Sequence, residues 1–380
     1  MPLNKEDIKK KLIESKSSSI IEIRSSVLSN NLKKFKEILG SHSFAAPVLK
    51  SNAYGHGIDL ITQLLISKNC KMLCVNDFND GALVREQGFK ERILVAGFLH
   101  KGLFDLAIKN QFEILISSSE ELHEVIQTKN SLAVHLKFDI GLGRRGFDPS
   151  RVFEIIDYLK KKSFYPRGVA AHFSVNDPVF DKELALIQLE KFKNIKQAFM
   201  NAGFRDTEFH VASSFSALNL KDSHFDFIRL GLAFYGHWNN GLKLSGSKSD
   251  TALNWFSYVA SIRKLKKGEN LGYGKDATVK KDRLIAAIPV GYFDGYPRHL
   301  SKDAGVFIEN QFFKLIGPVY MNMISVDITG SNVELGDSVL ILGSADQVRI
   351  DPGELAAWSD IPVDQLLCGL RERIPRILSE

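Results

Sequence analysis

Two side chains able to form a covalent bond with a carbonyl group or to carry a proton stand at distinctive places in the chain. In VLKSNAYGHG (residues 48–57), Lys50 ends an apolar segment and is followed by a tyrosine, a histidine and two glycines. Partial loss of solvation lowers the pKa of an ammonium group, and the neutral amine forms a Schiff base with an aldehyde. Tyr273 lies between two glycines, where a tight turn can project its phenol as an acid or base. Their positions alone would also fit ordinary structural roles, with Lys50 as a surface lysine and Tyr273 packed at the end of a loop.

Small residues follow two later apolar runs. HVASSFSAL (210–218) passes through serines, and RLGLAFYG (229–236) passes through glycine. In parallel barrels, the segments after the seventh and eighth strands often bind phosphate through backbone N–H groups. The same residues also serve as ordinary helix caps and turns, so their location favours a phosphate site without requiring one.

Several charged side chains fall at the ends of apolar runs. Arg229 needs a partner if it is buried, since its charge cannot be titrated away, and either a heterocyclic nitrogen or a structural carboxylate would serve. His172 and His210 follow neighbouring runs. Arg144 could hold a carboxylate or lie in a solvated loop. Lys137, if it points into the fold beside an arginine, would be repelled unless it is neutral or converted to an anion.

The elements that must position these residues come from a repeated pattern between residues 40 and 235. Short apolar runs alternate with longer amphipathic stretches, and this predicts a parallel (β/α)8 barrel of the TIM type. The eight runs are residues 44–50, 72–77, 92–98, 112–117, 132–139, 166–174, 207–212 and 225–231. Functional side chains in such a barrel lie at the carboxyl ends of the strands, where Lys50, Asp139, His172 and Arg229 fall.

The pattern changes after about residue 240. Short β-rich runs broken by glycine predict a mostly antiparallel β domain, with a return to helix near 351–368. We therefore expect an N-terminal extension and a strand (1–24) that joins the β domain, the barrel (25–240) and the C-terminal β domain (241–380).

Composition narrows the class of protein. The chain has 380 residues, 44% of them hydrophobic, and a net charge of +6, which suits a soluble enzyme of two domains. The sequence has no basic patch with interleaved aromatic residues, so we do not expect it to bind nucleic acid. Three cysteines without zinc spacing indicate a reducing compartment and no structural metal. No signal peptide or membrane-spanning run is apparent, so a cytoplasmic location is expected.

Taken together, the motifs resemble those of the alanine racemases, a family of pyridoxal-phosphate-dependent enzymes with a barrel and a C-terminal β domain. The matching stretches occur in order over nearly the whole chain: VLKSNAYGHG, HLKFDIGLGRRGF, HFSVND, IRLGLAFYG, NLGYG, VGYFDGYPR, GPVYMNMISVDIT and CGLRERIPR. The resemblance implies a homodimeric bacterial isomerase that interconverts L- and D-alanine and supplies D-alanine for peptidoglycan.

The resemblance also implies a role for each matching residue. Lys50 would hold the cofactor as an aldimine and act as one base, and Tyr273 of a partner subunit would be the base on the opposite face. The remaining cofactor contacts would be Tyr54, Ser214, Gly231 and Leu232 around the phosphate, Arg229 supported by His210 at the pyridine nitrogen, and His172 along the ring.

Substrate binding follows from the same resemblance. Arg144 and the backbone N–H of Met321 would bind the substrate carboxylate, and Lys137 matches a lysine that the family often carries as a carbamate. Val363 stands where the family usually has a tyrosine at the substrate entrance. This departure predicts a wider entrance and relatively better turnover of serine or larger amino acids.

Three other functions remain open at the level of sequence. A racemase of broader specificity would share every motif. A non-catalytic barrel protein that binds pyridoxal phosphate would lack the β domain, so Tyr273 and residues 250–380 disfavour it. A barrel-type decarboxylase usually pairs the pyridine nitrogen with a carboxylate, which Arg229 contradicts.

Overall fold

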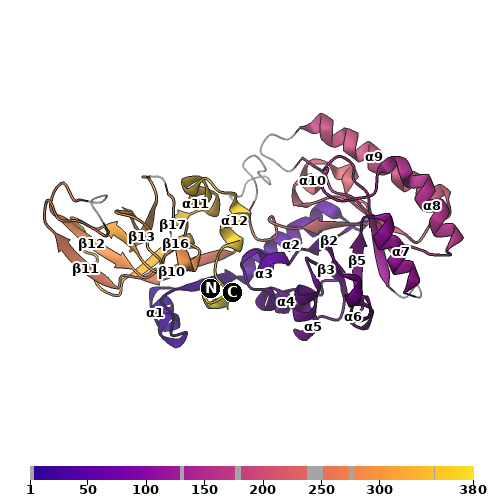
Figure 1. The fold of residues 1–380 in the computed structure, drawn as a ribbon. Helices are drawn as coiled ribbons and strands as arrows, with labels where there is room; N and C mark the ends of the chain where they lie inside the picture. The colour runs from indigo at the N-terminus through magenta and orange to yellow at the C-terminus, as the bar shows by residue number, and fades with distance from the viewer. Residues whose placement is uncertain are drawn as a thin grey trace.

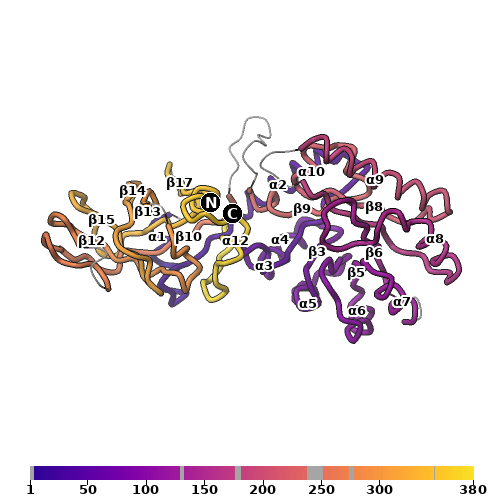
Figure 2. The backbone as a smooth tube through the Cα atoms, turned by 45° about the horizontal axis from the view of Figure 1, so that its top comes forward, coloured from indigo at the N-terminus to yellow at the C-terminus, as the bar shows by residue number. Residues whose placement is uncertain are grey.

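The computed structural model describes residues 4–128, 132–175, 181–237, 251–273, 278–300, 302–345 and 347–380. Two lobes lie end to end (Figures 1 and 2), an α/β lobe and a β-rich lobe, and both chain ends lie close to their junction. The domain boundary expected near residue 240 lies outside the described residues.

The α/β lobe is a barrel of parallel strands, as predicted. Its strands are β2 (Phe44–Pro47), β3 (Met72–Val75), β4 (Arg92–Val95), β5 (Phe112–Ile116), β6 (Ala133–Lys137), β7 (Gly168–Ala170), β8 (Glu208–His210) and β9 (Phe227–Leu230). β3 to β8 form one parallel sheet in sequence order, and β2 pairs with β9. Parallel bridges from Val48 to Cys74 and from Ser213 to Arg229 connect the two sheets and close the barrel. Each of the eight predicted apolar runs contains one of these strands.

Helices cover the outside of the barrel (Figure 1). They are α2 (Ser25–Leu39), α4 (Ile58–Ser67), α5 (Phe78–Glu86), α6 (Phe104–Lys109), α7 (Ser119–Gln127), α8 (Val152–Lys161), α9 (Lys182–Asn201) and α10 (Ser214–Asn219), with short 3-10 turns η1 (Lys101–Leu103), η2 (Pro149–Arg151) and η3 (Lys221–Ser223). Side-chain caps define several starts: Asp77, Ser118 and Asp181 each accept a hydrogen bond from the backbone N–H three residues on.

The β-rich lobe contains two sheets. Its elements are α1 (Lys5–Glu14), β1 (Ile20–Arg24), β10 (Leu253–Tyr258), β11 (Ser261–Leu265), β12 (Arg283–Ile288), η4 (Tyr292–Asp294), β13 (Gly305–Ile308), β14 (Gln311–Lys314), β15 (Ile324–Asp327), β16 (Ser338–Ala345), β17 (Val348–Ile350), α11 (Pro352–Ser359), α12 (Val363–Cys368) and β18 (Arg376–Ser379). One sheet has the order β14-β13-β16-β10-β1-β18, with β17 beside β16, and the other is β11-β12-β15.

Most pairs in this lobe are antiparallel, as predicted, and β1 lies within it. β1 pairs antiparallel with β10 and parallel with β18. α1 packs Ile8 and Leu12 against Ile20, Phe256 and Leu340. The helix predicted near 351–368 is two helices, α11 and α12.

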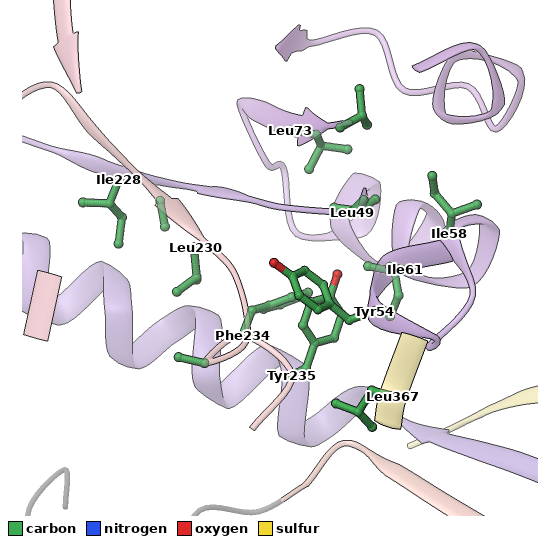
Figure 3. Close-up of a cluster of buried hydrophobic side chains, with 14 of the residues drawn as sticks. Leu49, Tyr54, Ile58, Ile61, Leu73, Ile228, Leu230, Phe234, Tyr235 and Leu367 are labelled. Atoms are coloured by element: carbon green, nitrogen blue, oxygen red, sulfur yellow. The ribbon is translucent and has the colours of Figure 1, made fainter. Parts of the chain in front are cut away.

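A hydrophobic core continues from one lobe into the other (Figure 3). Leu49 and Tyr54 come from the segment after β2, Tyr235 follows β9, and Leu367 comes from α12 of the β-rich lobe. No helix within the described residues is long and apolar enough to cross a membrane.

The junction is fixed by close backbone contacts at Gly55. The Arg376 guanidinium donates to the Gly55 carbonyl at 3.1 and 3.2 Å, and to carbonyls near its own strand. A Cβ added at Gly55 would lie 2.1 Å from the Leu367 carbonyl oxygen, and Gly55 has a φ of +78°. Only glycine therefore allows α12 to approach this segment so closely.

Gly55→Ala is expected to destabilise the protein much more than Gly88→Ala. Both glycines have positive φ, but a Cβ at Gly88 meets nothing within 4 Å. The control, Gly88→Ala, should lower the free energy of unfolding by about 1–2 kcal/mol because alanine is strained in the left-handed conformation. Gly55→Ala should lower it by about 1–3 kcal/mol more because of the clash with Leu367. Denaturant unfolding of both variants measures the difference, and equal losses would show that the Leu367 contact yields without cost.

Candidate active site

A cavity of about 400 Å³ opens at the carboxyl ends of the barrel strands. Nine residues predicted from the sequence line it: Lys50, Tyr54, Lys137, Arg144, His172, Ser214, Arg229, Gly231 and Leu232. Tyr273 and Met321 belong to the β-rich lobe of the same chain and do not line it. Their exposed fractions are 88% and 54%.

A left-handed turn places Lys50 in the cavity. Val48 N–H donates to the Leu230 carbonyl and Leu49 N–H to the Cys74 carbonyl, which ties the end of β2 to its neighbours. The segment labelled α3 (Lys50–Tyr54) then follows, and its residues 51–54 all have φ between 52° and 55°. This conformation costs L-residues about 1–2 kcal/mol each, so surrounding contacts must hold it in place.

Side chains of the same motif supply those contacts. The Asn52 Oδ1 atom accepts a hydrogen bond of 2.8 Å from Ile58 N–H. The buried His56 ring donates through Nδ1 to the carbonyls of Ala53 and Tyr54, at 3.1 and 2.9 Å. The polar residues after Lys50 thus fix the backbone that orients it.

Tyr54, Ser214 and Gly231 form a small cradle in the cavity wall. Gly231 N–H donates to the Ser214 hydroxyl at 2.9 Å. A Cβ at Gly231 would lie 3.1 Å from the Tyr54 hydroxyl oxygen and 3.8 Å from that of Ser214. Burial raises the pKa of Tyr54 well above its usual value, so the phenol stays protonated and can donate. Neutral donors around an open backbone suit a phosphate group.

Arg229 extends into the cavity with neutral acceptors around it. Nη1 donates to His210 Nδ1 at 2.5 Å, and Nη2 donates to His172 Nδ1 at 3.0 Å and to the Ala171 carbonyl at 2.8 Å. Burial lowers the pKa of Arg229 to about 10, which leaves it charged at neutral pH. Burial, followed by the charge of Arg229, lowers the pKa of His172 to about 3, so this ring is neutral.

Lys137 lies at the end of β6 among positive charges. Burial, then Arg229 and Arg144, lower its pKa to about 8. Asp139 does not face this group as a free base, because its Oδ1 accepts from three successive backbone N–H groups at residues 141–143. Asp139 therefore shapes the loop that presents Arg144.

The neighbouring Arg145 has a different role. Its guanidinium donates to the Ser117 hydroxyl and to the carbonyls of Gly97 and Leu115 at 2.6–2.8 Å. Arg145 thus ties the loop to the barrel wall, whereas Arg144 lines the cavity.

The predicted entrance residue is not the one that reaches the cavity. Val363 packs against the hydrophobic core, and the adjacent Asp364 lines the cavity from α12. The reason is the orientation of α12, which turns its first residue inward; the α12 sequence alone does not indicate that orientation. The wider entrance expected from Val363 stays a prediction. Sequence reasoning also missed His135 and Glu113, which lie directly below Arg229 and His210.

Family models identify both lobes. Residues 23–238 match the model described as "Alanine racemase, N-terminal domain", and residues 252–378 match "Alanine racemase, C-terminal domain". The chain belongs to the alanine racemase family. An alanine racemase of Leptospira interrogans (serovar Lai) is 30% identical over 372 residues, which cover 95% of this chain and 96% of the relative. Alanine racemase 1 of Clostridium acetobutylicum is 29% identical over 90% of this chain and 89% of its own.

Solved alanine racemase structures have the same fold. The alanine racemase of Clostridium difficile 630 superposes with a TM-score of 0.88 and 26% identity, over 95% of this chain and 96% of that one. The alanine racemase of Acinetobacter baumannii superposes with a TM-score of 0.83 and 26% identity, over 95% of this chain and 99% of that one. The predicted family and fold are therefore confirmed.

The donor set of the cavity fits the cofactor that the alanine racemase motifs imply. Lys50 offers an amine to an aldehyde, the cradle at Gly231 offers neutral donors to a phosphate, and Arg229 offers a charged N–H to a ring nitrogen. These three functions match the aldehyde, the phosphate and the ring nitrogen of pyridoxal phosphate.

Proposed function

We propose that this protein is a pyridoxal-phosphate-dependent isomerase that interconverts L- and D-alanine. The observation that carries the proposal is the convergence of Lys50, the cradle at Gly231 and Arg229 on one cavity. When bound, the cofactor supplies an electron sink that acidifies the Cα–H of the attached amino acid. Everything else is done by the protein: it holds both molecules and moves the proton.

Seven residues would hold the cofactor. Lys50 would bind its aldehyde carbon, His172 would lie along the ring and Arg229 would donate to the ring nitrogen, while Tyr54, Ser214, Gly231 and Leu232 would surround the phosphate. Because the arginine keeps its proton, it would leave the ring nitrogen unprotonated, and the bound cofactor would supply a weaker electron sink. A weaker sink would limit side reactions of the bound amino acid.

Two bases on opposite faces would invert the substrate. Lys50 Nζ would remove or return the Cα proton on one face, and the Tyr273 phenol would do so on the other. A single base would tend to return the proton to the face it came from. Because Tyr273 is exposed and outside the cavity of its own chain, we propose a homodimer in which it enters the partner's site.

The substrate carboxylate would be held by Arg144 and by the backbone N–H of Met321. Lys137 would carry a carbamate, which is an anion and therefore removes the repulsion between this side chain and Arg144. We further propose that the enzyme is cytoplasmic and bacterial, that it serves peptidoglycan synthesis, and that the chain divides into residues 1–24, 25–240 and 241–380.

The carbamate gives a prediction that depends on pH. A carbamate forms from the neutral amine and CO2, so the lowered pKa of Lys137, about 8, makes the reaction favourable near that pH. With ¹³C-bicarbonate, a protein-bound carbamate signal is expected in the ¹³C NMR spectrum and should be missing from Lys137→Ala. Below pH 8 the neutral fraction falls about tenfold per unit. Identical spectra for both proteins at pH 8 would contradict the assignment.

The test of the function is a racemisation assay on purified protein loaded with pyridoxal phosphate. L- and D-alanine, L-serine and L-lysine are offered separately, and the enantiomers are resolved by chiral chromatography. We expect alanine to be the best substrate, and the wider entrance predicted from Val363 would make serine turnover relatively better. Serine turnover equal to that of alanine would indicate the broader racemase instead, and no turnover of any of them would exclude a racemase of these amino acids.

A further inference from the structure

A buried chain of hydrogen bonds runs through the barrel interior beneath the cavity. Arg229 Nη1 lies 2.5 Å from His210 Nδ1, and His210 Nε2 lies 3.0 Å from His135 Nδ1. His135 Nε2 lies 2.7 Å from Glu113 Oε2. Both histidines are fully buried and Glu113 is 6% exposed. The chain therefore links four strands through the buried barrel interior and reaches the cavity at Arg229.

Glycine at one position makes this chain possible. His135 is on β6 and His210 is on β8, so β7 lies between them. A Cβ at Gly168 of β7 would lie 2.1 Å from His135 Nδ1. Because Gly168 has no side chain, the His135 ring can pass over β7 and reach the His210 ring. Phe227 stacks on the His210 ring, with the ring centroids 4.2 Å apart.

The far end of the chain is an ion-pair network at the opposite mouth of the barrel. Arg92 donates to both carboxylate oxygens of Glu113, at 2.6 and 2.9 Å. It also donates to both oxygens of Glu208, at 2.9 and 2.5 Å. Burial raises the pKa of Glu113, but hydrogen bonds from His135 and Arg92 outweigh it and hold that pKa at about 2. Glu113 is therefore an acceptor at neutral pH.

The donor and acceptor roles along the chain have one consistent direction. Arg229 can only donate, so His210 Nδ1 must accept and its proton lies on Nε2. His210 Nε2–H then donates to His135 Nδ1, which leaves the His135 proton on Nε2, facing the Glu113 carboxylate. A second proton on either ring would bring two N–H groups face to face in one contact.

We propose that Glu113 and His135 are positioning residues that fix the tautomer of His210, so that His210 holds Arg229 with an N–H directed into the cavity. This rests on the proposed function, in which that N–H meets the ring nitrogen of pyridoxal phosphate. If His210 carried its proton on Nδ1, it would oppose the Arg229 N–H. The carbonyls of Ala171 and Val211 would keep Arg229 in the cavity, but the N–H that should meet the ring nitrogen would point elsewhere.

The direct test is the tautomeric state of the histidines in the cofactor-free protein. Long-range ¹H–¹⁵N spectra of histidine-labelled protein distinguish Nδ1–H, Nε2–H and charged rings, and loss of a signal in His135→Phe or His210→Asn assigns it. We expect both His135 and His210 to be neutral with the proton on Nε2. A charged ring, or an Nδ1 proton on His210, would overturn the proposal.

A matched pair of variants separates positioning from general stability. Glu113→Gln and Glu208→Gln each remove one charge that pairs with Arg92, but only Glu113 contacts His135. The glutamine amide at 113 can donate to His135 Nε2 and reverse both tautomers. We expect Glu113→Gln to populate the Nδ1–H form of His210 and to weaken pyridoxal phosphate binding about tenfold, the loss of one hydrogen bond to a charged group. Glu208→Gln should keep the wild-type tautomer and affinity.

Equal effects of the two variants on the His210 signals would contradict the proposal, since Arg92 alone would then explain them. Thermal unfolding followed by circular dichroism checks that both variants are folded. The cofactor-free spectra test the hydrogen-bond chain, whereas binding of pyridoxal phosphate tests the proposed function. A protein with the expected tautomers that binds no cofactor would therefore refute the function and leave the hydrogen-bond chain intact.

Discussion

Replacing Tyr273 by phenylalanine is expected to lower racemisation by about 10²–10⁴-fold, the usual contribution of a general acid or base. The change removes one hydroxyl and keeps the ring, which contacts Tyr320 with centroids 6.2 Å apart. Because the variant keeps Lys50, which would hold the cofactor and lines the cavity, the visible absorbance of bound cofactor should be retained. Lys50 would still act on one face, so one enantiomer should exchange its Cα hydrogen in D2O without inversion.

The matched control is Tyr165→Phe. Tyr165 is 76% exposed on the barrel lobe and packs beside Phe204, so it loses the same hydroxyl outside the site and should keep full activity. Chiral chromatography measures inversion, and proton NMR in D2O measures exchange. Full racemisation by Tyr273→Phe would remove this residue from the mechanism.

The proposed dimer adds a complementation experiment. Tyr273→Phe and Lys50→Ala are each expected to lose most or all activity, but a mixed dimer would contain one site with an intact Lys50 and the partner's intact Tyr273. After the two proteins are unfolded and refolded together, about a quarter of wild-type activity is expected, because half of the dimers are mixed and each has one intact site of two. No recovery from dimers shown to be mixed would place both residues in one chain.

Lys50→Ala is expected to abolish both racemisation and the covalent retention of cofactor. The amine is the proposed nucleophile, which the turn at residues 51–54 presents to the cavity, and alanine offers no replacement. Wild-type protein treated with pyridoxal phosphate and borohydride should carry the reduced adduct on the peptide that contains Lys50, as measured by mass spectrometry. The variant should carry none.

Lys162→Ala is the control for this change. Lys162 Nζ lies 6.0 Å from the ring centre of Tyr158, and Lys50 Nζ lies 5.4 Å from that of Tyr54. The two lysines thus share a local setting beside a tyrosine, but only Lys50 lines the cavity. A labelled peptide containing Lys162, or label retained by Lys50→Ala, would contradict the assignment of the cofactor lysine.

The barrel could be predicted from sequence because its strands are buried on both faces. Such strands appear as short continuous apolar runs, and the helical stretches between them separate one run from the next. The side chains at the carboxyl ends of these runs meet in one place by topology. This explains why nine of the predicted residues line the same cavity.

The features that sequence could not predict depend on contacts between distant segments. His135 and Glu113 lie inside apolar runs and look like core positions. His135 and His210 can meet only because Gly168, on the strand between them, has no side chain. The left-handed turn at residues 51–54 contains no glycine, so no local signal indicates it. FSYVASIRKL reads as one strand, but β10 and β11 belong to different sheets, with the break at Val259 and Ala260.

The position of β1 between β10 and β18 has a consequence for how the protein is made. All eight barrel strands have been made once β9 has left the ribosome, but β1 stays without a strand neighbour until β10 follows, and its second edge stays open until residues 376–379 have been made. An apolar strand with an open edge invites pairing with other chains. Removing residues 376–379 would therefore expose a sheet edge formed by residues 20–24, and we expect the shortened protein to aggregate rather than to lose only its C-terminal end.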